Sequence, residues 1–460
     1  MTFYPLFFIL FLTHSRPFIR IETLGRSDLN STTASDDVMR ASKYSLLKNL
    51  IKRLSDGKIK LEAKETLDLQ LPSSSEVNIF DAICELISDD DDSKILARSM
   101  DAISICSAFI HRIFDNFKNN PDAIFLAPSV KLLSLLSADD VLSKQILLEK
   151  DTLHLIKSHL VSPECCSPSS LSSTNDDDDN DGVIIKKLQF ISSSVYLLHQ
   201  ASSDSKVRKA LKTYEDEFVK YLEVLFNHIF QASHNISNRT VLFEMLYCYK
   251  EMALFLKSIL ASKESTLLTQ NVGSIIPNLG LVLYRTCNEF KEKLSKNKTN
   301  YKNDFSLLYS TVSGLLEVLG SFSLLETFKN SFSIELSMIY SIPNRKVKYC
   351  TAEVILNVSE MQEFSDLKSL SYGVLMNICH NSTETLKLQL IESGALNIIH
   401  KQINIFSELT KEDRKLLEQG EEVKNLTGLE ISRVFGLLSR LSTLSVVIEK
   451  VNFLILNAIL

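Results

Sequence analysis

The sequence predicts an all-α protein built as a stacked array of helices, and two observations carry this prediction. Glycine and proline are scarce, with 12 Gly and 9 Pro in 460 residues, whereas sheets joined by tight turns need glycine at positive φ. Apolar residues recur at intervals of three and four along most of the chain, as on one face of a helix. Convincing two-residue alternation, the pattern of a half-buried strand, is absent from the sequence.

The helical pattern follows an N-terminal leader, residues 1–45. This leader comprises an apolar start and a polar, Ser/Asp-rich stretch that we expect to be loose. In the N-terminal helical part, residues 46–160, an apolar stripe runs through Ile79, Ile83 and Ile87. Along the whole chain, further helices are expected at 129–137, 141–160, 184–201, 214–231, 239–261, 272–294, 304–324, 347–359, 366–380, 383–402, 411–423 and 427–445.

Residues 161–182 form the clearest break in the helical pattern. Ser, Pro and Asp dominate them, so we interpret the stretch as a disordered surface insertion that separates residues 46–160 from residues 183–460. Its aspartates partly match the start of a calcium-binding EF-hand loop. The position that needs a bidentate glutamate is Leu188, however, so we expect an acidic tract and no calcium site.

Helices of this length, joined by short polar loops, fit an array in which each unit buries its apolar face against its neighbours. An irregular bundle of many helices is the alternative. The two arrangements share the same periodicity, so the periodicity alone does not separate them.

Charge and motif content favour a protein without catalytic chemistry. A net charge of −6 and a pI near 5.9 argue against a nucleic-acid partner. His154 and His159 are five residues apart and fall on different faces of a helix, so they do not form a zinc pair. Phosphate-binding loops, nucleophile elbows and Cys–His signatures are absent from the sequence. We therefore expect no enzyme, no cofactor and no metal.

The sequence favours a cytoplasmic protein without a membrane anchor. Its eight cysteines show no framework spacing, which suits a reducing compartment. Residues 3–13 resemble the core of a signal peptide, but they lack a basic start and a clear cleavage site, and they are too short to span a bilayer. Seven Asn-x-Ser/Thr triplets also occur, two of them at Asn357 and Asn381 in or beside apolar helices. Secretion is the alternative interpretation.

Residues 371–400 resemble the junction between armadillo repeats. An apolar helix with the sequence Val-Leu-Met-Asn-Ile-Cys is followed by a polar turn, and then by Glu-Ser-Gly-Ala-Leu, in which Gly394 suits a helix break. Residues 352–359 and 434–442 echo the apolar helix. In armadillo proteins this helix lines a concave groove, and its asparagine binds the backbone of an extended peptide. The resemblance therefore implies that Asn357, Asn377 and Arg440 form a partner-binding row.

Residues 372–379, 428–442 and 446–450 together resemble the armadillo part of the tetratricopeptide repeat protein 12 family. The resemblance implies a right-handed armadillo-like superhelix in residues 183–460, clearest at 347–445. It also implies a cytoplasmic, co-chaperone-like factor in the assembly of axonemal dynein arms for motile cilia, with dynein arm subunits and chaperones as protein partners.

The sequence departs from this family in three respects. The chain has no Trp, and residues 1–180 show no clear repeat of about 34 residues, so we expect the family's tetratricopeptide repeats to be missing. Asn357 and Asn377 are only 20 residues apart, where a full repeat takes roughly 40, which predicts that part of a repeat is lost; the apolar end of the chain likewise suggests truncation. A general armadillo adaptor with another client, such as a myosin chaperone, and a secreted or membrane-tethered helical protein are the alternatives.

Overall fold

The computed structural model describes most of the chain between residues 33 and 444, in the ranges 33–62, 74–116, 123–162, 178–232, 239–262, 275–296, 302–336, 349–360, 365–419 and 427–444, together with residues 421 and 423. These residues form twenty helices and no strand, and they include an isolated β-bridge between Glu335 and Cys350. The prediction of an all-α protein is confirmed. The apolar residues 3–13 lie outside the described residues.

The helices have the following bounds. The N-terminal half comprises α1 (Thr33–Glu62), α2 (Ser74–Ile87), α3 (Asp91–Ser99), α4 (Ala102–Asn116), α5 (Ala123–Ser137), α6 (Val141–Glu149), α7 (Thr152–Leu160), α10 (Asp178–Ala201), α11 (Ser205–Leu211) and α12 (Asp216–Ala232). The C-terminal half comprises α13 (Arg239–Ala261), α14 (Ile275–Lys296), α15 (Lys302–Ser323), the 3-10 helix η3 (Glu326–Ser333), α16 (Thr351–Ser359), α17 (Ser365–Cys379), α18 (Glu384–Glu392), α19 (Ala395–Ser407), α20 (Lys411–Glu418) and α21 (Gly428–Leu441).

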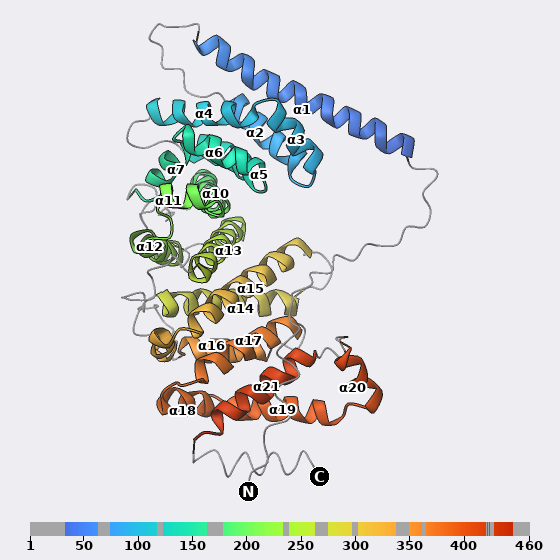
Figure 1. Cartoon of the computed structure of the whole chain (residues 1–460), viewed down its shortest axis with the longest axis vertical. Helices are drawn as coiled ribbons and strands as arrows, with labels where there is room; N and C mark the ends of the chain where they lie inside the picture. Colours follow the sequence, from blue (N-terminus) through green and yellow to red (C-terminus); the bar gives the residue numbers. More distant parts are fainter. Residues whose placement is uncertain are drawn as a thin grey trace.

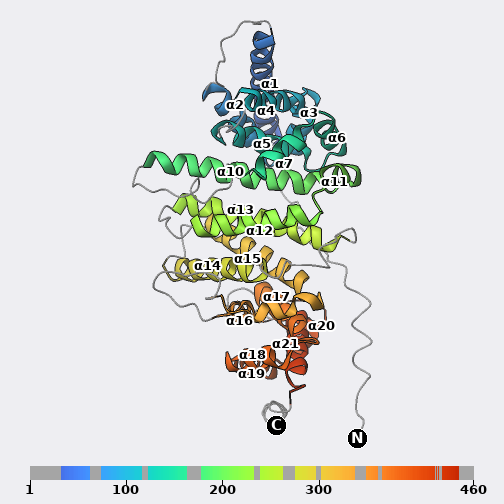
Figure 2. The same cartoon turned by 90° about the vertical axis from the view of Figure 1, so that its left-hand side faces the viewer.

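The helices follow one another along the long axis of the molecule in sequence order, from α1 at one end to α18, α19 and α21 at the other (Figure 1). Helices α2, α5, α10, α13, α15, α17 and α21 each pack against the next helix of this set, which we call the main row. Figure 2 shows α10, α13 and α15 lying across the long axis, one after another. A second row runs beside it, in which α4 contacts α7, and α14 contacts both α12 and α16.

The two rows are built from a recurring three-helix unit. Each unit consists of a short helix, a second-row helix and a main-row helix, and the units are α3–α4–α5, α6–α7–α10, α11–α12–α13, η3–α16–α17 and α18–α19–α21. Between the third and fourth of these, α14 and α15 contribute one helix to each row. Helix α20 is an addition between α19 and α21.

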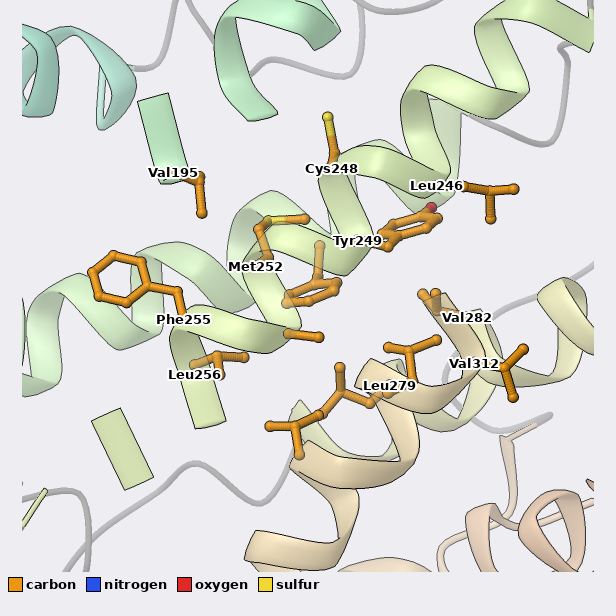
Figure 3. Close-up of a cluster of buried hydrophobic side chains, with 14 of the residues drawn as sticks. Val195, Leu246, Cys248, Tyr249, Met252, Phe255, Leu256, Leu279, Val282 and Val312 are labelled. Carbon is orange, nitrogen blue, oxygen red and sulfur yellow. The ribbon is translucent and has the colours of Figure 1, made fainter. Parts of the chain in front are cut away.

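The core lies between the rows and between successive units. Figure 3 shows its centre, where Met252 and Phe255 of α13 meet side chains of α10, α14 and α15. All the residues labelled there are at most 3% exposed. These side chains come from four helices of successive units, so this part of the core is shared between units.

Two turn features position the short helices. Asp90, Asp140 and Asp204 cap the N-termini of α3, α6 and α11, and the Asp140 carboxylate accepts from the Ser143 N–H at 2.8 Å. The turn into the second-row helix then uses one left-handed residue, which is Asp101 (φ 61°), Asp151 (φ 60°), Lys212 (φ 52°) or Gly394 (φ 97°). The turn that the sequence predicts at Gly394 therefore also occurs at residues that carry a Cβ.

The structure corrects several predicted boundaries. Residues 33–45 of the expected leader are helical and form the first part of α1. The middle part of α1 carries the stripe Leu47, Leu50, Ile51 and Leu54, which is buried against α2, α3 and α4. Residues 178–182 of the expected insertion belong to α10, where aspartates in the first turn suit the positive end of the helix dipole; residues 163–177 lie outside the described residues. The expected helices 141–160 and 383–402 are each divided in two by a left-handed turn.

Candidate protein-binding face

The three predicted groove residues lie on two different rows. Asn377 belongs to α17 and Arg440 to α21, which are neighbours in the main row, whereas Asn357 belongs to α16 in the second row. Asn357 and Asn377 are half-buried, and Arg440 is exposed. The single row of three residues is therefore not formed. The short spacing between the two asparagines arises because α16 and α17 are consecutive helices of one unit, not because part of a unit is lost.

Helices α17 and α21 approach each other closely at two glycines. A Cβ added at Gly373 would lie 3.0 Å from Arg433 Nε, and one added at Gly436 would lie 2.4 Å from Met376 Sδ. These glycines are 63 residues apart in sequence, as are Asn377 and Arg440. Asn377 and Arg440 each lie four residues after one of these glycines, on consecutive main-row helices.

A buried polar cluster fastens α21 to α17 close to this pair. Lys368 Nζ lies 3.5 Å from Glu430 Oε1, with side chains 5% and 0% exposed. Arg433 donates to Ser369 Oγ at 3.0 Å. Burial, and then the Glu430 carboxylate, raises the pKa of the nearby Tyr372 hydroxyl, and burial lowers the pKa of Arg433. The cluster thus joins the two helices through buried polar contacts.

Polar side chains bridge other steps of the main row. Gln189 of α10 donates to Glu244 of α13 at 2.9 Å, and Lys257 of α13 pairs with Glu317 of α15. Lys186 of α10 pairs with Asp81 of α2 at 3.6 Å, two helices back in the row. Burial raises the pKa of Glu244, and the bond from Gln189 partly offsets this effect. The exposed ring of Tyr247 lies one helical turn along α13 from Glu244. The main row therefore presents charged, amide and aromatic groups along its length.

A second set of polar contacts, which sequence reasoning missed, joins the start of three of the units to their end. The fourth residue after the N-cap of every short helix is basic: Lys94, Lys144, Arg208, Lys329 or Lys387. Three of the lysines are buried and reach the residues that follow their own unit's main-row helix. Lys144 donates to Ser203 Oγ at 3.0 Å, Lys329 to the His380 carbonyl, and Lys387 to Thr443 Oγ1 at 2.9 Å. A capping residue followed by Lys or Arg four positions later is the signal that would have found them.

The described residues offer few groups suited to chemistry. They contain no group of three or more His, Cys, Asp or Glu side chains placed to hold a metal ion. All six cysteines in this part of the chain are buried, and burial raises the pKa of Cys84, Cys350 and Cys379 to about 12, which disfavours the reactive thiolate. His159 packs between the rings of Phe114 and Phe190. Among the helices that the structure describes, each is too short or too polar to cross a lipid bilayer.

No protein-family model matches the sequence, and no curated protein matches it at a significant level. The likeness to the tetratricopeptide repeat protein 12 family thus depends on the short stretches quoted above and stays a prediction.

Proposed function

We propose that the chain is a non-catalytic scaffold of the armadillo type, a right-handed superhelix whose main row binds an extended segment of a partner protein. The observation that carries the proposal is the succession of main-row contacts from α2 to α21, in units that begin with the same capped short helix. A continuous row of parallel ridges offers one long surface, as in other helical repeat proteins.

Asn377 and Arg440 are the proposed contacts at the C-terminal end of this row. An asparagine amide both donates and accepts, so it can pair with a peptide backbone whatever side chains the partner carries. Arg440 adds a planar donor group for a carbonyl or carboxylate. Asn357, on the second row, is not part of the proposed face.

The partners that we propose are subunits of axonemal dynein arms, with the protein acting as a cytoplasmic assembly factor together with chaperones. This choice depends on the family resemblance of residues 372–379 and 428–442. A general armadillo adaptor with another client, such as a myosin chaperone, is the second candidate, and it is favoured by the apparent lack of tetratricopeptide repeats in residues 1–180.

Affinity capture from lysates of ciliated cells tests the proposed face and the client together. The double variant Asn377→Ala/Arg440→Ala should capture dynein heavy chains roughly tenfold less well than the wild type, since two hydrogen bonds contribute about 0.5–1.5 kcal/mol each. Asn357→Ala, the matched control on the second row, should capture them normally. Circular dichroism of all three proteins checks that helicity is unchanged. Equal capture by the double variant and the wild type would remove the two residues from the binding face.

Glycosidase treatment of protein from fractionated cells tests the compartment. A cytoplasmic protein keeps its mass, because its Asn-x-Ser/Thr triplets meet no glycosylation enzyme. A mass decrease after treatment would instead support the secreted or membrane-tethered alternative.

A further inference from the structure

Three exposed aliphatic side chains lie on the first two short helices. Ile95 of α3 is 58% exposed, and Val141 and Leu142 of α6 are 52% and 68% exposed. We call these three residues the short-helix patch. Single exposed apolar residues are common on protein surfaces, whereas a group of them in one place usually marks a site of contact.

The two helices that carry the short-helix patch lie on the same side of the stack. Both α3 and α6 pack against α4 and α5, and Figure 2 shows them next to each other. Burial acts to raise the pKa of Asp140, the N-cap of α6, but hydrogen bonds within the cap and then the nearby charge of Arg98 on α3 lower it. Arg98 lies about one helical turn after Ile95, and Asp140 directly precedes Val141. The members of the patch are therefore close to one another.

Val141 and Leu142 are unusual among the short helices. They occupy the first turn of α6, where the helix dipole favours acidic side chains. The same two positions hold polar or charged residues in the other four units, which are Asp91 and Asp92, Ser205 and Lys206, Glu326 and Thr327, and Glu384 and Thr385. The apolar pair serves neither the cap, which Asp140 provides, nor the core, because both side chains are exposed. A contact with another molecule accounts for it.

Acidic side chains border the short-helix patch. Asp92 lies three residues before Ile95 and shares its side of α3. Asp139 lies just before the cap of α6, and both aspartates are exposed. The nearby Lys94 pairs with Asp91 at 2.8 Å. The border of the patch thus complements a partner that carries basic side chains beside its apolar ones.

We propose that the short-helix patch binds an amphipathic helix of a partner protein. The apolar stripe of that helix covers the patch, and lysines or arginines beside the stripe face Asp92 and Asp139. The patch contains no residue of the main row, so this inference goes beyond the proposed partner-binding face and does not depend on it.

A synthetic helical peptide tests the surface on the full chain. It carries leucines at i, i+3, i+4 and i+7 with lysines beside them, and fluorescence anisotropy measures its affinity. The double variant Val141→Glu/Leu142→Thr gives α6 the first-turn residues of α18 and makes the protein more acidic. It should nevertheless bind the peptide about tenfold more weakly, because the apolar contact is lost.

Leu324→Thr is the matched control, because Leu324 is 67% exposed and lies outside the patch. This variant should bind the lysine peptide as the wild type does. Equal affinity of the wild type and the double variant, or no binding of the peptide by the wild type, would overturn the proposal.

The charge of the peptide provides a second test. A peptide with glutamates in place of the lysines should bind about tenfold more weakly, and Asp92→Asn/Asp139→Asn should reduce this difference. Equal binding of the two peptides by the wild type would contradict a basic partner. If the wild type were a dimer in analytical ultracentrifugation and Val141→Glu/Leu142→Thr a monomer, the patch would bind a second copy of the chain, which would also overturn the proposal.

Discussion

Gly280 lies at the closest approach between α14 and α16. A Cβ at this position would lie 2.3 Å from Thr351 Oγ1 and 3.0 Å from Thr351 Cβ. Thr351 is fully buried, and its hydroxyl donates to the Ile276 carbonyl at 3.3 Å, so the side chain cannot turn away without losing this bond. We expect Gly280→Ala to lower the free energy of unfolding by about 1–3 kcal/mol, as for other overpacked sites; urea unfolding measures the change.

Gly314 of α15 is the matched control for this substitution. A Cβ added there meets nothing within 4 Å, and alanine stabilises a helix interior relative to glycine by roughly 0.5–1 kcal/mol. Gly314→Ala should therefore keep or raise the stability. If both variants lost the same stability, the close approach of α14 and α16 would not be the cause.

His199 lies where α10 meets α13, and its protonation makes the stability of the protein depend on pH. Its Nε2 lies 3.1 Å from Ser258 Oγ, and its ring stacks on Phe255. Burial lowers its pKa from 6.5 to about 4. The unfolded chain thus takes up this proton first, so the contribution of the neutral ring is complete above pH 6.5 and is lost as the pH falls toward about 4.

His199→Gln removes this titration and keeps an amide near Ser258. The unfolding free energy of the variant should fall less steeply than that of the wild type between pH 6.5 and pH 4, which denaturant titrations at several pH values measure. Parallel pH profiles for the two proteins would show that His199 is not protonated on unfolding in this range.

At the scale of the helix, Lys387 joins the start of the last unit to its end. Its ammonium group is buried and donates to Thr443 just beyond α21, where the helix dipole also favours a positive charge. We expect Lys387→Met to lower stability by about 1 kcal/mol and to speed amide exchange at the end of α21.

Lys94→Met provides the comparison at the same position of the first unit. Lys94 bonds to Asp91, whose side chain is 86% exposed, and such surface pairs contribute little. This variant should change stability by less than about 0.5 kcal/mol. If Lys387→Met also left the stability unchanged, the hydrogen bond from Lys387 to Thr443 would not contribute to stability.

The sequence predicted the helices better than the breaks between them. Apolar periodicity indicated most main-row helices to within a few residues, because their buried stripes are long. The periodicity does not show that residues 141–160 form two helices. In the sequence Asp151 looks like an ordinary polar surface residue, and only the structure shows its left-handed backbone. Gly394 was recognised because glycine favours that backbone. The sequence predicts Asn357 and Asn377 in one row because it does not show where each three-helix unit begins. That start decides to which row a helix belongs.

For the whole molecule, we propose that each unit is held chiefly by its neighbours along the stack. The contacts support this arrangement, because the main-row helices pack in the order of the sequence. An irregular bundle, the alternative left open by the sequence, would share one core among distant segments and would lose stability as a whole. A binding surface that extends along the row requires the stacked arrangement.

Amide hydrogen exchange of Gly280→Ala, mapped along the full chain, distinguishes the stack from the irregular bundle. In a stack, the damage should be local: exchange should speed up in α14, α16 and the helices packed on them, and stay as in the wild type in α3, α4 and α5. The same acceleration in every helix, including α3 to α5, would show one shared core and contradict the stacked array.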